Sequence, residues 1–313
     1  MIKNFRELRK NDANIAGGKG ASLGEMLNNG IPVPDGFVLL ATVFEELLDT
    51  NDLGQKIETI LREVQREDMT TIENASENIR SLIVHVAIPA EREREILHAF
   101  RNLRCEFVAV RSSATAEDGA DHAWAGQLDS FLNTAEETLL SNIKKCFASL
   151  FSPRAIFYRL ERNLQTTKVS VAVVVQKMIQ SEVSGIAFSV HPVTEDHHHI
   201  LIEAGFGLGE AIVSGQITPD SYIVDKEENT LLEKNITEQE RGIFKEHDRN
   251  IWKTVPKEEQ EKQKLTDECI LELARLVTTI ETHYGFPCDI EWTFNNGKFF
   301  IVQSRPITTL GKH

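Results

Sequence analysis

The longest apolar run in the chain, VSVAVVV at residues 169–175, most constrains what the chain can fold into. The run is nearly continuous and rich in β-branched residues, which is typical of a strand covered on both faces. It is far too short to span a membrane as a helix. A chain of 313 residues is long enough to bury such a strand in a substantial core. The run therefore predicts a layered, folded domain with this strand at its centre.

Helical patterns dominate before this run and strand patterns dominate after it. Apolar positions recur every three or four residues over 54–66, 70–86 and 90–102, which predicts helices. Later segments predict strands at 184–193 and 198–207, and a hairpin around DKEEN. The regular strand–helix alternation of a doubly wound nucleotide fold is absent from the pattern. The sequence predicts an α+β protein with a mostly antiparallel sheet system in its second half.

Composition and charge exclude several classes of protein. The formal charge of −14 disfavours a nucleic-acid partner or an anionic membrane surface, because either would repel the chain. The N-terminal MIKNFRELRKND lacks the apolar core of a signal peptide. The four cysteines form no CxxC pair and suit a reducing compartment. We expect a cytoplasmic protein with no membrane and no nucleic-acid partner.

The C-terminal segment DIEWTFNNGKFFIVQSRP predicts a hairpin that carries a candidate metal site. Its Asn-Asn-Gly turn places Glu291 almost opposite Gln303, within one residue or a bulge. Arg305 lies on the same face of the return strand as Gln303. Carboxylate and amide oxygens suit Mg²⁺, and an arginine beside them suits phosphate. A salt-bridged sheet surface is the alternative explanation of the same pattern.

Two basic residues of the first half are candidate phosphate ligands. Lys19 lies in GGKG at the start of a predicted helix over 17–30, where glycines let backbone amides approach an anion. The Walker P-loop pattern is absent, and a helix-capping turn explains the same residues. Arg111 follows the apolar strand 107–110 and opens a long loop that ends near Gly126. Such a loop fits a lid over phosphates or an ordinary surface loop.

Three further motifs are ambiguous on pattern alone. Gln176, Lys177 and Met178 end the buried strand, where backbone groups can meet an adenine edge. GFGLGE (205–210) matches either a glycine-rich phosphate loop or a tight turn between a strand and a helix. The triplet His197–His199 favours a solvated turn over a metal site, because no further ligand lies at a suitable spacing.

Taken in order, these motifs resemble one family from end to end. The segments that carry the resemblance are GGKGASLGEM (17–26), VAVRSSATAED (108–118), AGQLDSFLN (125–133), ASLFSPRAIFYR (148–159), VVVQKMI (173–179), SGIAFS (184–189), GLGEAIVSGQITPDSY (207–222) and DIEWTFNNGKFFIVQSRPIT (289–308). They are similar to the ATP-binding domain of phosphoenolpyruvate synthase, pyruvate phosphate dikinase and rifampicin phosphotransferase. The ending QSRPITTL is most similar to the rifampicin phosphotransferase branch.

The resemblance implies an ATP-grasp fold, in which two lobes bind ATP and Mg²⁺ between them. The lobes would be residues 1–190, with the helical part and a phosphate lid, and residues 191–313, with the metal-binding hairpin. The roles implied are phosphate binding and catalysis for Lys19, Arg111 and Arg305, nucleotide contacts in the lid for Gly126 and Ser130, an adenine contact for Gln176, and Mg²⁺ binding for Glu291 and Gln303, with Gln303 also near the nucleotide.

The resemblance also implies a reaction and partners that this chain does not carry. Family members pass the β-phosphoryl group of ATP to a histidine on a swivelling domain, which then phosphorylates an acceptor held by another domain. No segment here matches the swivelling-domain histidine motif, so we expect those domains to be supplied in cis or in trans. The chain also departs from the family in its lid, where GADHAW (119–124) replaces the usual residues.

Two other functions remain open at this point. One is a non-catalytic nucleotide-binding regulatory subunit, which would need the same ATP contacts. The other is an ATP-grasp carboxylate–amine ligase, which the end-to-end resemblance disfavours. By itself the chain is expected to bind ATP without completing the transfer. The acceptor (pyruvate, a rifamycin or another compound) and the oligomeric state are not encoded in any motif of this chain.

Overall fold

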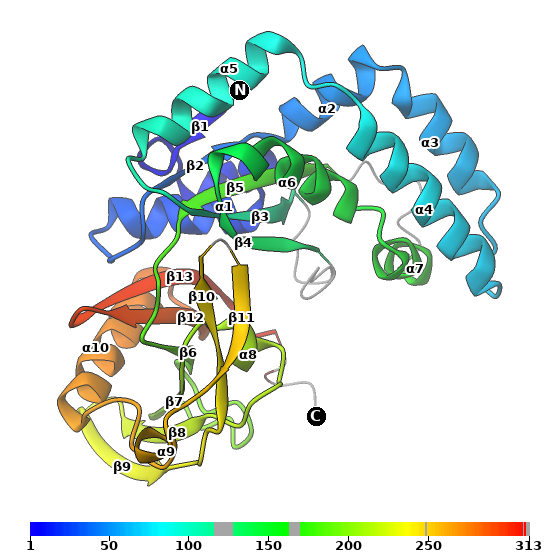
Figure 1. The fold of residues 1–313 in the computed structure, drawn as a ribbon. Helices are drawn as coiled ribbons and strands as arrows, with labels where there is room; N and C mark the ends of the chain where they lie inside the picture. Colours follow the sequence, from blue (N-terminus) through cyan, green and yellow to red (C-terminus); the bar gives the residue numbers. More distant parts are fainter. Residues whose placement is uncertain (116–127, 163–169, 248, 309, 311–313) are drawn as a thin grey trace. The chain divides into compact units, whose positions relative to one another are not determined.

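A computed structural model describes residues 1–115, 128–162, 170–247, 249–308 and 310 of the chain. It contains helices and antiparallel sheets, which confirms the α+β prediction. The chain divides into two compact units (Figure 1). The first unit is Met1–Glu25 with Asp35–Met178, and the second is Met26–Pro34 with Ile179–His313. The lobes 1–190 and 191–313 stay a prediction, and each unit is described by itself below.

The first unit is built on a five-stranded antiparallel sheet with the order β1-β2-β5-β3-β4. Its strands are β1 (Ile2–Asn4), β2 (Gly36–Leu39), β3 (Val108–Ala114), β4 (Ser130–Thr134) and β5 (Val171–Lys177). The strand β5 comes from the long apolar run, lies in the middle of the sheet and is buried from Val171 to Gln176. The prediction of a strand covered on both faces is therefore confirmed.

The strand β3 is longer than the sequence predicts. The apolar run suggests a strand that ends at Val110, whereas β3 continues to Ala114 and is buried throughout. The expectation that a loop begins at Arg111 is therefore wrong. Residues 111–114 are polar or small, yet they pair with Val174–Val171 of β5, so tertiary pairing overrides their weak strand preference.

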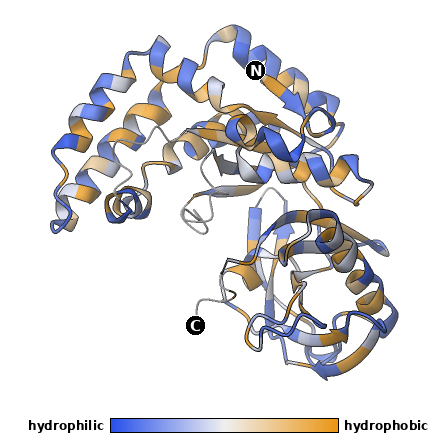
Figure 2. Ribbon diagram, turned by 180° about the vertical axis from the view of Figure 1, so that it is seen from behind, coloured by the Kyte–Doolittle hydropathy of each residue, from blue (hydrophilic) through white to orange (hydrophobic). Residues whose placement is uncertain are grey.

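Seven helices of the first unit lie among the described residues, and most were predicted. They are α1 (Ala13–Asn28), α2 (Ala41–Thr50), α3 (Leu53–Arg62), α4 (Met69–His85), α5 (Ala90–Asn102), α6 (Glu136–Ser149) and α7 (Pro153–Glu161). Figure 2 shows both hydrophobic and hydrophilic residues on the long helices, as expected of helices that cover a core. Phe44 of α2 stacks on Phe147 of α6 at 5.1 Å between ring centres. Ser152 caps α7 through the amide of Ala155, with Pro153 at the first helical position.

The second unit contains a six-stranded antiparallel sheet with the order β13-β12-β6-β7-β8-β9. Its strands are β6 (Val183–Phe188), β7 (His199–Phe206), β8 (Asp220–Asp225), β9 (Thr230–Asn235), β12 (Cys288–Asn295) and β13 (Lys298–Pro306). The helix α10 (Asp267–Tyr284) lies along this sheet (Figure 1). Thr266 caps its start by accepting from the Cys269 amide, and Gly285 ends it with a φ of 76°. Two short helices, α8 (Glu210–Val213) and α9 (Lys257–Gln260), also belong to this unit.

A two-stranded sheet of the second unit was not predicted. It consists of β10 (Arg241–Glu246) and β11 (Arg249–Thr254), and Arg241 stacks over the ring of Trp252 at 4.5 Å. Charged residues interrupt both strands, so the alternation that marks a strand is weak there. Across the described residues of both units, no helix is long and apolar enough to cross a bilayer.

A fully buried ion pair joins separate segments of the second unit. The Lys264 ammonium lies 2.9 Å from Asp220 Oδ1, and both side chains have 0% exposure. The carboxylate of Asp220 also accepts hydrogen bonds from the Thr237 amide and from the Tyr222 hydroxyl. Burial and this carboxylate raise the pKa of Tyr222, so the phenol remains a hydrogen-bond donor. These bonds satisfy the Asp220 carboxylate, and Lys264 Nζ also donates to the carbonyls of Thr237 and Gln260, so both buried charges have further partners.

We predict that Lys264→Met lowers the free energy of unfolding by about 3–5 kcal/mol, because it leaves the Asp220 carboxylate buried without its cation. The control is Lys262→Met, which removes an exposed pair with Glu259 and should cost less than about 1 kcal/mol. Urea unfolding of both variants measures the difference. An equal decrease in the free energy of unfolding for both variants would show that the buried pair contributes no more to stability than the exposed pair.

Candidate functional site

Arg111 lies inside β3, next to the central strand of the first unit. Its side chain is 8% exposed, and its Nη1 donates to Gln176 Oε1 at 3.5 Å. Gln176 is 2% exposed and pairs with Ala109 in the sheet, so it lies diagonally opposite Arg111. The rigid strand pair therefore fixes this guanidinium. The adenine contact expected of Gln176 stays a prediction, and the structure shows its side chain accepting a hydrogen bond from Arg111.

Lys19 reaches the same strand from α1. Its Nζ donates to the carbonyl of Ser112 at 2.7 Å, and the Gly20 amide lies 3.4 Å from Ser113 Oγ. The ammonium of Lys19 is thus held against the carbonyl of the residue after Arg111, although 93 positions separate Lys19 from Ser112. Two basic residues that the sequence singled out separately therefore meet the same strand, β3.

Gly17 makes this approach of α1 to β3 possible. Its φ of 67° and ψ of 164° interrupt the helix, and side chains rarely adopt this conformation. A Cβ at this position would lie 2.1 Å from Ser113 Oγ and 2.5 Å from the Ser113 carbonyl oxygen. Because only glycine fits, the GGKG pattern marks the close packing of α1 on β3. This packing is what sets the position of Lys19.

The predicted lid is covered only in part by the structure. Gly126 and the altered segment 119–124 lie outside the described residues. Ser130 is the first residue of β4, is exposed, and pairs directly with Arg111. The strand that follows the predicted lid therefore begins beside the buried guanidinium.

The second cluster lies on the β12–β13 hairpin. Glu291 pairs directly with Gln303, and a bulge follows between Glu291 and Trp292. The register predicted from the turn, with its allowance for a bulge, is confirmed. On its other side Glu291 pairs with Ile186 of β6, so its carboxylate stands on a supported inner strand. A carboxylate oxygen and an amide oxygen are thereby presented from adjacent strands.

Asp289 is a residue of this cluster that the sequence analysis missed. Arg305 donates to Asp289 Oδ2 from Nε at 2.9 Å and from Nη2 at 2.7 Å. Burial raises the pKa of Asp289, the Arg305 charge opposes that rise, and the Glu291 charge adds to it. The sequence could have identified Asp289 from its position two residues before Glu291, because that spacing puts both side chains on one face of a strand. Asp289 therefore fixes the guanidinium of Arg305 beside the candidate metal ligands.

A third carboxylate faces the same side of this sheet. Glu203 of β7 pairs with Ile186, which in turn pairs with Glu291. Burial raises the pKa of Glu203, and the charge of Asp289 raises it further. Within the described residues no group of three His, Cys, Asp or Glu side chains has the geometry to hold a metal ion. The binding of Mg²⁺ by Glu291 and Gln303 therefore stays a prediction.

The glycine-rich segment 205–210 is a tight turn. The amide of Phe206 donates to Gln239 Oε1, that of Gly207 to the Glu182 carbonyl, and that of Leu208 to the Ile243 carbonyl. These three amides are used inside the chain, which weighs against a phosphate-binding role for the segment. The triplet at 197–199 is also explained locally, since His199 and His198 contact Asp196 and Glu227 at 3.2 and 3.4 Å.

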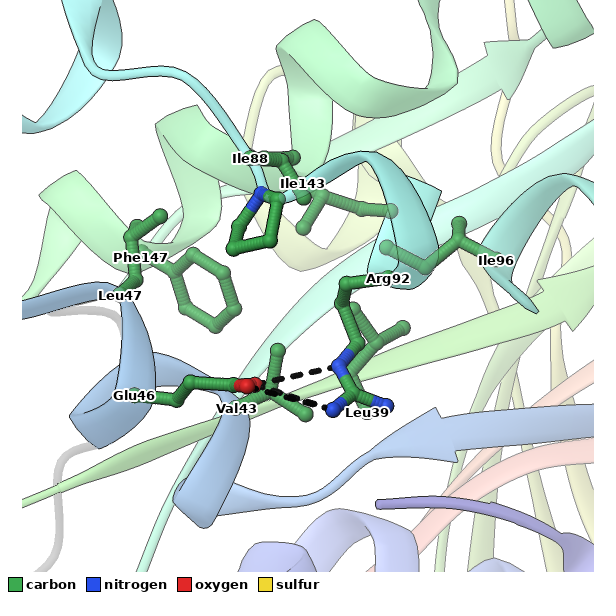
Figure 3. Close-up of a pocket in the computed structure, with 10 residues that line it drawn as sticks. Leu39, Val43, Glu46, Leu47, Ile88, Arg92, Ile96, Ile143 and Phe147 are labelled. Atoms are coloured by element: carbon green, nitrogen blue, oxygen red, sulfur yellow. Dashed lines mark hydrogen bonds and ion pairs between the residues drawn. The ribbon is translucent and has the colours of Figure 1, made fainter. Parts of the chain in front are cut away.

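A small cavity of the first unit lies among α2, α5 and α6 (Figure 3). Its volume is about 10 Å³, which is room for a single water molecule. At its edge Arg92 donates to the carboxylate of Glu46 at 3.1 and 3.4 Å. The cavity is too small for a nucleotide.

Comparison with known proteins connects these features to one family. Residues 13–313 match the family described as pyruvate phosphate dikinase, AMP/ATP-binding domain. The chain is 44% identical over 98% of its length to a probable phosphoenolpyruvate synthase of Methanocaldococcus jannaschii, and 45% identical over 98% to one of Archaeoglobus fulgidus. It is 40% identical over 99% of its length to a rifampicin phosphotransferase of Bacillus cereus. The chain spans 26%, 41% and 36% of these relatives, respectively.

We predict that Gly17→Ala lowers the free energy of unfolding by at least about 2 kcal/mol, because the new Cβ overlaps Ser113 and the backbone angle is strained. The control is Gly54→Ala, which meets open space and should raise stability by about 0.5–1 kcal/mol. Thermal unfolding of the two variants tests the difference. An unchanged midpoint for Gly17→Ala would contradict the close approach of α1 to β3.

Proposed function

Because the chain belongs to the pyruvate phosphate dikinase AMP/ATP-binding domain family, we propose that it binds Mg-ATP and donates a phosphoryl group to a histidine of a separate swivelling domain. In this proposal the fold is an ATP-grasp and the two units bind one nucleotide. The chain then supplies the phosphoryl donor site of a dikinase-type phosphotransferase. In this proposal another domain binds the acceptor, which would be pyruvate or a rifamycin.

The observation that carries the proposal is the placement of Lys19 against the peptide next to Arg111. A triphosphate carries several negative charges, so its binding requires fixed cations more than hydrophobic contact. Lys19 is held by the Ser112 carbonyl, and Arg111 is held by Gln176 on the adjacent strand. Both cations therefore reach a phosphate with little reorganisation. That pre-organisation is what electrostatic catalysis needs.

Support for Mg²⁺ comes from the donor set on the β12–β13 hairpin. Mg²⁺ prefers oxygen ligands, takes few of them from protein, and completes its shell with phosphate and water. Glu291 and Gln303 offer a carboxylate and an amide oxygen from directly paired positions. These two residues would hold the ion, which would neutralise charge on the phosphate oxygens. Arg305, held by Asp289, would bind a phosphate oxygen next to it.

The chemistry proposed for this chain is positioning and charge stabilisation. An imidazole nitrogen of the swivelling domain would form a bond to the β-phosphorus of ATP while the bond from that phosphorus to the oxygen of the α-phosphate breaks, so that AMP leaves. The electrons of the broken bond remain on the departing oxygen, whose charge Lys19, Arg111 and Arg305 stabilise. Water would then release the γ-phosphate as inorganic phosphate and leave one phosphoryl group on the histidine. No nucleophile of this chain is required. Residues of the predicted lid, Gly126 and Ser130 among them, would cover the nucleotide and exclude water.

We predict that calorimetric titration detects ATP binding that depends on Mg²⁺ and that Lys19→Met and Glu291→Ala each weaken it about tenfold or more. Lys19 and Glu291 belong to different units, so weaker ATP binding in both variants would support the proposal that both residues contact one nucleotide. Lys262→Met and Glu233→Ala, which alter exposed charges, are the controls and should bind ATP like the unmodified chain. Binding that neither Lys19→Met nor Glu291→Ala changes would rule out this site.

We also predict that the 313-residue chain alone forms no sustained AMP from ATP, because the phosphoryl acceptor lies on another domain. Addition of a histidine-bearing swivelling domain of the family should restore AMP formation, measured by chromatography of the nucleotides. Arg305→Ala should abolish the restored reaction. Rapid, sustained AMP formation by the pure chain would contradict the proposal.

A further inference from the structure

Ser112 is the residue at which three segments of the first unit meet. Its carbonyl accepts from Lys19 Nζ at 2.7 Å, and its amide donates to the Asp129 carbonyl at 3.1 Å. The amide and the carbonyl of one strand residue point to the same side of the strand. The carbonyl of Ser112 therefore faces the β4 side, where the described strand pairing ends at Arg111 and Ser130. Lys19 binds β3 at the end of this ladder.

The side chain of Ser112 points to the other layer, toward the end of α6. Its Oγ lies 3.0 Å from the Asp129 carbonyl, 3.2 Å from the Cys146 carbonyl and 2.9 Å from Ser149 Oγ. Ser149 Oγ in turn donates to the Cys146 carbonyl at 2.7 Å. Ser112, Ser149 and the two carbonyls thus form a closed polar network in an otherwise apolar core.

The hydrogen bonds of the two hydroxyls show what Ser149 adds. Each serine has one hydrogen to donate, and its oxygen can also accept. Ser149 donates to the Cys146 carbonyl, and the Ser112 hydroxyl can then donate to the Asp129 carbonyl or to Ser149 Oγ. Without the Ser149 hydroxyl, the network has one donor instead of two, and the Ser112 side chain keeps only the two carbonyls as partners in the network.

The other groups around this network cannot replace Ser149. Ser149 and Ser112 are each 0% exposed, so bulk water does not reach them. Burial raises the pKa of the Cys146 thiol to about 12, so it remains neutral. A thiol is a weak donor, and that of Cys146 lies 3.6 Å from the Val110 carbonyl and 3.9 Å from that of Asp129.

We propose that Ser149 is a positioning residue for the phosphate-binding lysine, acting through the Ser112 hydroxyl to fix the peptide that holds Lys19. This inference rests on the proposed role of Lys19 in ATP binding. Ser149 lies at the last residue of α6 and would never touch the nucleotide. The same network fixes Asp129, which precedes Ser130 at the start of β4, so it would also anchor the chain that returns from the predicted lid.

The test compares binding of ATP and of adenosine, both with Mg²⁺, by calorimetry on the 313-residue chain. Ser149→Ala should weaken ATP binding about five- to tenfold, as expected for the loss of one buried hydrogen bond, and should leave adenosine binding within about twofold. Ser76→Ala, another buried serine of the same unit, is the matched control and should change neither affinity. If Ser149→Ala fails to fold, Ser112→Ala carries the same comparison, since it removes the hydroxyl at the other end.

A double variant separates this inference from the proposed function. If Ser149 acts through Lys19, Lys19→Met with Ser149→Ala should bind ATP within about twofold of Lys19→Met alone. Full ATP affinity in Ser149→Ala, with weak binding in Lys19→Met, would overturn the inference and leave the proposed function intact. Equal losses for ATP and adenosine would also overturn it, because they indicate a general packing defect. If Lys19→Met binds ATP normally, both the phosphate site and the inference fail.

Discussion

The pairing of β3 with β5 is the interaction on which the first unit depends. Residues 111–114 have weak strand preference, and the pairing with β5 holds them in the centre of a sheet. Since side chains alternate along a strand, Arg111 and Ser113 face α1 while Ser112 faces the end of α6. One short strand therefore carries Arg111 on one face, accepts a hydrogen bond from Lys19 through the Ser112 carbonyl, and contacts α6 through the Ser112 side chain.

In the second unit, the β12–β13 hairpin places the candidate site residues. The bulge between Glu291 and Trp292 shifts the register by one residue after the Glu291–Gln303 pair. Trp292, which is 1% exposed, then packs in the core while Glu291 and Gln303 keep a shared face. Arg305 donates two hydrogen bonds to the Asp289 carboxylate. In both units a buried or half-buried polar partner orients each candidate phosphate-binding arginine.

Sequence patterns predicted most helices and strands, but they were weakest where polar residues lie inside strands. The end of β3 was placed too early because Arg111 and two serines follow the apolar run. The strands β10 and β11 were missed because charges interrupt them. Asp289 was not predicted as part of the site, although its place two residues before Glu291 puts it on the same face of β12. Hydrophobic patterns in the sequence reveal strands whose side chains are apolar. A strand with polar side chains lacks this pattern, so its extent becomes clear only from the strand that pairs with it.

By itself the sequence determined the class of fold and the β12–β13 register, and it predicted the residues that would bind phosphate and magnesium. These follow from local physics, since alternation, turn geometry and glycine content depend on neighbours along the chain. Only the tertiary structure decided that Lys19 contacts Ser112, that Gln176 holds Arg111 and that Ser149 completes the network behind them. Those contacts join residues that are 93, 65 and 37 positions apart, and spacing along the chain carries no signal for such hydrogen bonds.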